Sequence, residues 1–137
     1  MKGSKIDDLL RGVPKYGGVL AFDQIEFITP GKYWVVNSKP SNHPGEHWLV
    51  IDWTHKHPFL FDSFGKSPMF YGLTPMRHWK RHLQHPDSVT CGIYCVYYIV
   101  HRAKHYSPER MFQHFTKMRI QNDSRIKTWL RKRSKTL

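Results

Sequence analysis

The sequence predicts an α+β fold in which a central, antiparallel-rich sheet packs against one buried helix. Residues 47–53 (HWLVIDW) and 59–64 (FLFDSF) are apolar runs rich in β-branched and aromatic residues, and a short polar turn separates them. Residues 90–104 (TCGIYCVYYIVHRAK) are apolar nearly all round, which is typical of a helix inside a core. Strands followed by helices favour the α+β class.

The first part of the chain supplies a short helix and one strand. Residues 4–13 (SKIDDLLRGV) place Leu9, Leu10 and Val13 on one side of a short helix, and glycines mark a turn at the start of residues 16–27. Residues 32–38 (KYWVVNS) are predicted to be a strand. The proline, asparagine and glycine of residues 39–45 favour a loop.

The two apolar strands are predicted to form an antiparallel hairpin with a defined register. With the turn at residues 54–57, Trp53 pairs with Pro58 and His47 falls opposite Phe64. Asp62 then lies diagonal to His47 on the same face, about 7–8 Å away between Cβ atoms. Both strands are apolar on both faces, so we expect them in the middle of a sheet that is covered on both sides.

Residues 65–75 are predicted to be an irregular loop, because they contain two prolines and two glycines. One or two helical turns are predicted for residues 76–84. Asp87 or Ser88 can cap the buried helix that follows.

The last part of the chain is predicted to add two helices. Ser107 is a candidate N-cap with Pro108 at the first helical position, and residues 122–125 (NDSR) can start a final helix. We expect residues 1–137 to form one domain whose end, residues 123–137, is a basic helix or tail.

The formal net charge of +12 predicts an acidic partner: nucleic acid first, and a membrane surface or acidic protein second. No apolar run reaches the roughly 18 residues that span a membrane, and lysines followed by aspartates at the start do not form a signal peptide. We therefore expect a protein in a reducing, intracellular setting that is not secreted, and of these acidic partners we expect nucleic acid and no membrane.

The two cysteines, Cys91 and Cys95, lie four residues apart near the start of the buried helix. Redox motifs have two residues between their cysteines, so a redox pair is disfavoured. The best set of zinc ligands is His78, His82, Cys91 and Cys95, but cysteines inside a buried helix are poorly placed for zinc, and we predict no metal site. Cys95 fits a small buried apolar residue.

Cys91 has the setting of a nucleophile. Helix N-terminal amides lower a thiol's pKa and can bind a developing oxyanion, and Gly92 lets another chain approach closely. A cysteine nucleophile needs a histidine base oriented by a carboxylate. His47 and Asp62 fit these two roles, although Asp62 could instead cap the DSFG turn.

The motifs HW at a strand start, LFDSFG at the end of the next strand, and Gln84 seven residues before CG resemble the adenain family of viral cysteine proteases. The similarity is closest to adenain-like proteases of DNA viruses, virophages and virus-like transposons. It extends more distantly to the ubiquitin-like-protein (SUMO) proteases of the same superfamily. It covers about residues 10–104 and implies a papain-like or adenain-like fold.

The resemblance implies a role for each matched residue. Cys91 is expected to be the nucleophile, His47 the base and acid, and Asp62 the group that orients His47. Gln84 is expected to supply the side-chain donor of the oxyanion hole. The resemblance also implies substrate-binding residues. Gly45 and Glu46 would pair with an extended substrate, and Trp48 would lie beside the catalytic histidine. Gly92 would let the substrate chain approach closely.

The expected activity is that of a cysteine endopeptidase that matures a capsid by cleaving viral capsid or core precursor proteins. We expect a monomer in the virion and the infected cell. The segment between residues 65 and 84 is shorter than in adenain and carries no third cysteine, so no disulfide-linked activating peptide is expected. Two alternatives stay open: a peptidase for ubiquitin-like proteins, and a basic nucleic-acid-binding module that is not an enzyme.

No cofactor is expected other than DNA as a non-covalent activator. Six of the 13 residues from Arg125 to Leu137 are Lys or Arg, and a second basic group, RHWKRH, lies at residues 77–82. The predicted DNA contacts are Arg131, Lys132 and Arg133, with part of the basic charge facing solvent while Ile126 and Trp129 pack. The resemblance to adenain, which uses DNA in this way, favours nonspecific binding.

Overall fold

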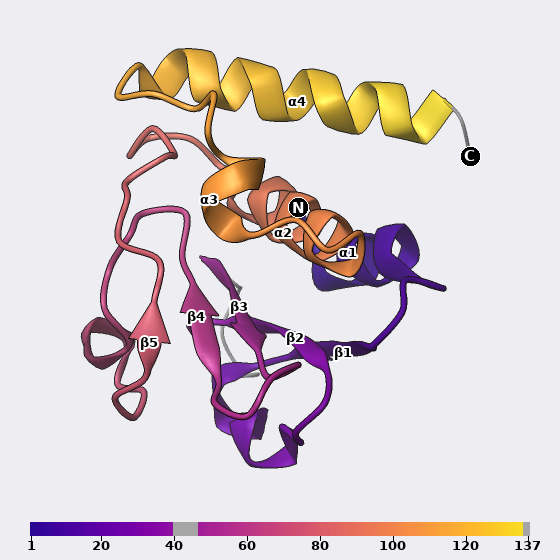
Figure 1. Ribbon diagram of the computed structural model, residues 1–137, viewed down its shortest axis with the longest axis vertical. Helices are drawn as coiled ribbons and strands as arrows, with labels where there is room; N and C mark the ends of the chain where they lie inside the picture. Colours follow the sequence, from indigo (N-terminus) through magenta and orange to yellow (C-terminus); the bar gives the residue numbers. More distant parts are fainter. Residues whose placement is uncertain (40–46, 136–137) are drawn as a thin grey trace.

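The computed structural model describes residues 1–39 and 47–135, which form helices around a five-stranded mixed sheet (Figure 1). The strands lie in the order β1-β2-β3-β4-β5, with β2, β3 and β4 antiparallel and the outer strands β1 and β5 parallel to their neighbours. The predicted α+β class is confirmed, but the sheet is not antiparallel throughout. The strands are Tyr16–Leu20 (β1), Tyr33–Asn37 (β2), Trp48–Asp52 (β3), Phe59–Phe61 (β4) and Arg77–His78 (β5).

The β3–β4 hairpin has the register that the sequence predicts. Val50 pairs with Phe61 and Asp52 pairs with Phe59, which is the alignment that follows from pairing Trp53 with Pro58. Because β3 is the central strand, its side chains are buried on both faces. The prediction of a sheet covered on both sides is confirmed.

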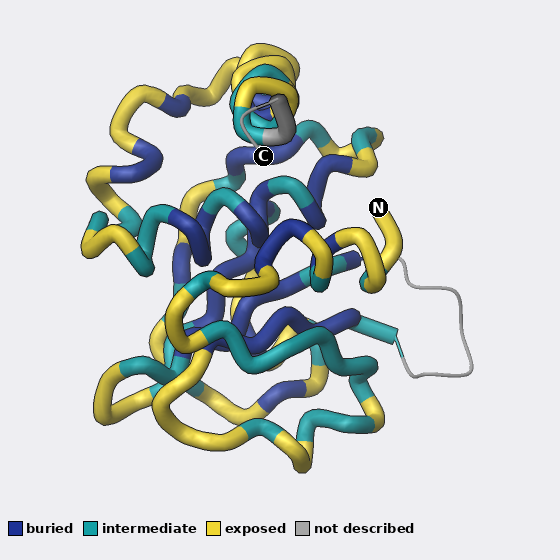
Figure 2. The backbone as a smooth tube through the Cα atoms, turned by 90° about the vertical axis from the view of Figure 1, so that its right-hand side faces the viewer, coloured by how far each residue is buried: buried dark blue, intermediate teal, exposed yellow. Residues whose placement is uncertain are grey.

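Alternate residues of the central strands feed two separate cores. Val35, Val50 and Phe61 pack with the helices, whereas Val36, Leu49 and Leu60 pack on the other face. Loop and 3₁₀ side chains complete that second core, and the buried chain is concentrated where the helices meet the sheet (Figure 2).

Four α-helices lie on one side of the sheet, with the longest crossing above the others (Figure 1). The buried helix α2 packs on β3, and both α1 and α4 pack on α2. The helices are Gly3–Leu10 (α1), Cys91–Ala103 (α2), Pro108–Met111 (α3) and Arg119–Lys135 (α4), and two 3₁₀ helices are Phe22–Phe27 (η1) and Pro68–Tyr71 (η2).

Several predicted boundaries differ from the observed ones. Neither Asp87 nor Ser88 caps α2, because the N-cap residue is Thr90. The predicted helical turns at residues 76–84 are wrong: part of this segment forms β5, with the Trp79 N–H donating to the Leu60 carbonyl. The turn at the start of residues 16–27 is wrong as well, since these residues begin with β1.

The final helix begins at Arg119, before the predicted start at residues 122–125. Asn122 and Asp123 are committed to tertiary hydrogen bonds in place of capping. Ser107 is an N-cap as predicted, because its hydroxyl accepts from the Arg110 N–H at 3.1 Å.

Gly65 brings the end of the hairpin against the segment before α2. Its φ is +69°, and a Cβ atom there would lie 2.7 Å from the Lys80 carbonyl oxygen, so the position requires glycine. The close approach places Asp62 and Ser63 next to the segment that carries Gln84. Within residues 1–39 and 47–135, no helix has the length and apolarity needed to cross a bilayer.

Candidate active site

His47 and Asp62 are brought together at the open end of the hairpin. The His47 Nε2 atom lies 2.6 Å from a carboxylate oxygen of Asp62, and the Asp62 side chain is completely buried. Because Nε2 faces the carboxylate, Nδ1 is the ring nitrogen left to exchange a proton with another group. The hairpin register puts both side chains on one face, as the sequence predicts.

Asp62 is held by further donors, so its carboxylate is fixed in position. It accepts from the backbone N–H groups of Phe64 and Lys66, each at 3.0 Å, and from the Tyr71 hydroxyl at 2.6 Å. Burial alone would raise the pKa of Asp62, but hydrogen bonds and the charge of His47 keep it below its ordinary value. Asp62 therefore stays ionised, and it both contacts His47 and caps the turn that follows it.

The His47 ring stacks with two aromatic rings. Phe64 stacks on it at 4.5 Å between ring centroids, and Tyr71 lies at 5.8 Å with a similar plane. Tyr71 thus contacts both members of the pair, and sequence reasoning missed it. Its only sequence signal is a tyrosine within the loop of residues 65–75.

Cys91 is the first residue of α2 and faces His47. Burial would raise the pKa of its thiol, but a hydrogen bond to His47 and the histidine's charge lower it, helped by the backbone N–H groups of Trp48 and Gly92. In the same way, burial would lower the pKa of His47, but Asp62 and Cys91 raise it to about 9. Thiolate and imidazolium therefore stabilise each other.

A distant helix holds the start of α2 in place. The Asp123 carboxylate of α4 accepts from the hydroxyls of Thr90 at 3.2 Å and Tyr94 at 2.9 Å, and from the backbone N–H of His85 at 3.2 Å. These bonds fix the turn that presents Cys91.

Gln84 lines the same cleft as Cys91 and is almost fully buried. Its side-chain oxygen accepts from the Ser63 hydroxyl at 2.6 Å, and its amide nitrogen donates to the Ser88 carbonyl at 3.0 Å. Sequence reasoning did not single out Ser63, although it follows Asp62 directly.

A cleft of about 570 Å³ brings these residues to one surface. His47, Gln84 and Cys91 all line it, together with residues from the loops on either side: Ser38, Lys39, Phe64, Lys66, Phe70, Tyr71, Pro86 and Ser88. A thiolate, a proton-transferring imidazole and amide donors therefore face one space, which is the set needed to attack a carbonyl carbon and stabilise the resulting oxyanion.

Two of the predicted substrate-binding residues do not lie in the wall of the cleft. Trp48 and Gly92 are not among the residues that line the cleft. A Cβ atom on Gly92 would lie 3.1 Å from Met1 and 3.3 Å from Trp48, and the Trp48 indole donates to the Met1 carbonyl at 2.9 Å. Gly92 is thus packed against Met1 and Trp48 of the same chain. Gly45 and Glu46 lie outside the described residues.

The alternative zinc ligands are not assembled. Across residues 1–39 and 47–135, no three histidine, cysteine or acidic side chains are grouped so that they could hold a metal ion. His78 instead bonds the Trp79 carbonyl at 3.0 Å.

The two basic segments singled out from the sequence do not line the cleft. On α4, Arg131 and Lys132 are exposed, whereas Arg133 lies over the Trp129 ring at 5.8 Å. Ile126 and Trp129 pack on the core, as predicted.

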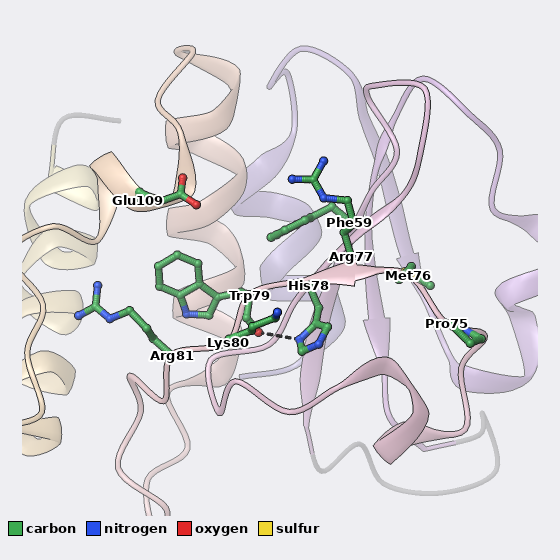
Figure 3. Close-up of a pocket in the computed structure, with 9 residues that line it drawn as sticks. All are labelled: Phe59, Pro75, Met76, Arg77, His78, Trp79, Lys80, Arg81 and Glu109. Carbon is green, nitrogen blue, oxygen red and sulfur yellow. Dashed lines mark hydrogen bonds between the residues drawn. The ribbon is translucent and has the colours of Figure 1, made fainter.

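The second basic group borders a larger cavity of about 790 Å³ beside β5 (Figure 3). Arg77, Lys80 and Arg81 surround it together with Glu109. Arg81 is already bonded to the carbonyls of Phe112 and Phe115. This cavity contains no cysteine among its lining residues.

Comparison of the chain with known proteins found no family model that it matches and no significant match among curated proteins. Any function must therefore be argued from the geometry of these residues.

Proposed function

We propose that the protein is a cysteine endopeptidase of the adenain-like type, with a papain-like arrangement of sheet and nucleophile helix. One observation carries the proposal: a buried His47–Asp62 pair, at 2.6 Å, faces a cysteine at the first turn of a buried helix. A structural cysteine needs neither a buried imidazole beside it nor a carboxylate with four hydrogen bonds behind that imidazole.

The first half of the reaction forms an acyl-enzyme. The Cys91 thiolate attacks the carbonyl carbon of the scissile bond, and the displaced electron pair moves to the carbonyl oxygen. Gln84 and the backbone N–H of Cys91 donate to that oxyanion. The imidazolium of His47 gives its Nδ1 proton to the leaving amine as the carbon–nitrogen bond breaks.

The second half releases the carboxylate product. His47, now neutral, takes a proton from a water molecule that attacks the thioester. Collapse of the second tetrahedral intermediate expels the Cys91 thiolate and restores the ion pair with His47. Asp62 keeps the ring oriented throughout and stabilises its charged form.

Viral capsid or core precursor proteins are the proposed substrates, and the virion and infected cell the proposed location. Both rest on the resemblance described above. A peptidase for ubiquitin-like proteins would use the same chemistry but would need a docking surface for a folded partner. Cleavage of a ubiquitin-like precursor in preference to short peptides would favour that alternative.

An active-site probe tests the chemistry directly. A peptide carrying a thiol-reactive warhead should label Cys91 alone, as mapped by mass spectrometry, and a labelled protein should no longer cleave peptides. The matched control is the His47→Ala variant, which should react slowly at Cys91. Equal labelling of Cys91 and Cys95, or cleavage that survives full labelling, would refute the proposal.

Nonspecific DNA binding is proposed as a second property, carried by the exposed basic side chains of α4. If the protein contacts about five phosphates of duplex DNA, the logarithm of the binding constant should fall with the logarithm of the salt concentration with a slope of roughly −4 to −5. Replacing Arg131, Lys132 and Arg133 by alanine should flatten that slope by about two to three, with cleavage of a free peptide unchanged. No binding at about 50 mM salt would contradict this role.

A further inference from the structure

Ser63 makes two hydrogen bonds to Gln84 and a third to its neighbour Leu83. Its hydroxyl lies 2.6 Å from the Gln84 side-chain oxygen, and its carbonyl accepts from the backbone N–H groups of Leu83 and Gln84 at 2.8 and 3.1 Å. Both Ser63 and Gln84 are about 99% buried. An interaction at this depth is shielded from competing water, so it fixes the amide.

The orientation of the Gln84 amide follows from its partners. The Ser88 carbonyl can only accept, so it must face the amide NH₂ group, here at 3.0 Å. The side-chain oxygen then faces Ser63, whose hydroxyl must be the donor. Among the described residues, Ser88 is the one acceptor bonded to that NH₂ group, which leaves its second hydrogen for a ligand in the cleft.

We propose that Ser63 is a positioning residue for the oxyanion donor Gln84. This inference rests on the proposed function and assigns Ser63 no contact with substrate. The dipeptide Asp62–Ser63 then serves both halves of the machinery: Asp62 orients the imidazole, and Ser63 turns the Gln84 N–H towards the oxygen that becomes negative.

The tests use peptide cleavage by the full chain and compare side chains of matched shape. Ser63→Ala should lower kcat about tenfold with KM little changed, because the donor is misaligned when the charge develops. Ser63→Thr keeps the hydroxyl, whereas Ser63→Val has the same shape without it. The kcat of Ser63→Thr should therefore exceed that of Ser63→Val by about the same factor. Ser67→Ala, in the exposed loop nearby, is the control and should match the wild type.

A double-mutant cycle separates positioning from general stabilisation. Gln84→Ala alone should lower kcat by roughly 10²–10³. In that background, Ser63→Ala should change kcat by less than about twofold, because there is no donor left to position. Losses that multiply in the double variant would overturn the proposal.

A pair of thiol reagents provides a second readout. Iodoacetamide alkylates Cys91 without forming an oxyanion, so its rate should be unchanged in Ser63→Ala. A peptide aldehyde adds the Cys91 sulfur to its carbonyl carbon and places the electron pair on oxygen, which takes up a proton. Its inhibition constant should rise about tenfold in that variant. Equal changes with both reagents would overturn the proposal.

The two proposals can fail separately. If the wild-type protein shows no hydrolysis that depends on Cys91, the proposed function is refuted. Wild-type hydrolysis that depends on Cys91, with an undiminished kcat in Ser63→Ala, would refute only the role of Ser63.

Discussion

The first and second turns of α2 each carry a cysteine, yet the two thiols have opposite properties. Cys91 lies beside His47, and its pKa is lowered by the hydrogen bond and charge of that ring, which outweigh burial. Cys95 is fully buried within the core, and burial followed by the charge of Cys91 raises its pKa well above the ordinary value. One helical turn therefore separates a thiolate from a packed thiol.

The difference shows that depth alone does not determine reactivity. Cys91 is 6% exposed and Cys95 is not exposed at all, so burial disfavours both thiolates. What distinguishes Cys91 is a cationic partner, His47, and the backbone N–H groups of Trp48 and Gly92. The comparison predicts that variants at the first turn affect chemistry and those at the second turn affect stability.

The largest expected effect comes from removing the first-turn thiol. Cys91→Ala should abolish peptide cleavage, because no other group can form the acyl-enzyme, while circular dichroism shows an intact fold. Cys95→Ala should keep its kcat within about twofold, since its thiol is only packed. Residual cleavage by Cys91→Ala would remove the distinction between the two cysteines.

The next largest effect tests the partner that makes Cys91 different. His47→Ala should lower kcat by about 10³–10⁴, because both proton transfers lose their carrier. Asp62→Asn should be milder, since an amide oxygen still accepts from the ring N–H but does not stabilise imidazolium. Steady-state kinetics of both variants show which one loses more kcat, and alkylation of Cys91 in each variant checks the reactivity of its thiol. A larger loss in Asp62→Asn would contradict it.

The pH dependence of alkylation sharpens the comparison further. The pKa of Cys91 is lowered from the ordinary value of 9.0, so iodoacetamide should react with it at a lower pH than with an ordinary thiol. Cys95 should stay unreactive until the pH passes its raised pKa. Turnover should also fall as the pH rises through about 9, where His47 loses the proton that the leaving amine needs.

The pH dependence of alkylation has a matched control. In His47→Ala, the alkylation profile of Cys91 should move to higher pH, towards the ordinary thiol. Quantifying both modified cysteines at each pH by mass spectrometry measures the separation. Superimposable profiles for Cys91 and Cys95 would mean that His47 has no influence on either thiol.

The smallest effect is on stability at the second turn. Cys95→Ala should lower the free energy of unfolding by about 1 kcal/mol, because removing a buried sulfur leaves a small cavity. Urea denaturation of the folded variant measures this cost. A large loss of kcat with an unchanged fold would place Cys95 in the site.

The sequence predicts the parts of the site that depend on local pattern. The turn length sets the register that puts His47 and Asp62 on one face, and the apolar helix sets the places of Cys91 and Cys95. These predictions succeed because strand alternation and helical period are properties of short segments.

What the sequence does not predict depends on how distant segments pack. Trp79 and Leu83 have the i, i+4 spacing of a helix, but both are buried side chains of the irregular segment that follows β5. Tyr71 reaches Asp62 from a loop, and Ser63 reaches Gln84 across 21 residues. No local pattern encodes such contacts.

The bond between Asp123 and Thr90 joins residues 33 apart in the chain, and this has a consequence for the timing of folding. Contacts of long sequence separation form late, because the entropy of closing the intervening loop must be overcome first. During synthesis, Asp123 also leaves the ribosome after His47, Asp62, Gln84 and Cys91, the four proposed catalytic residues. We therefore expect the turn that presents Cys91 to become ordered only once α4 has docked, so that a nascent chain carries all four proposed catalytic residues before they are assembled.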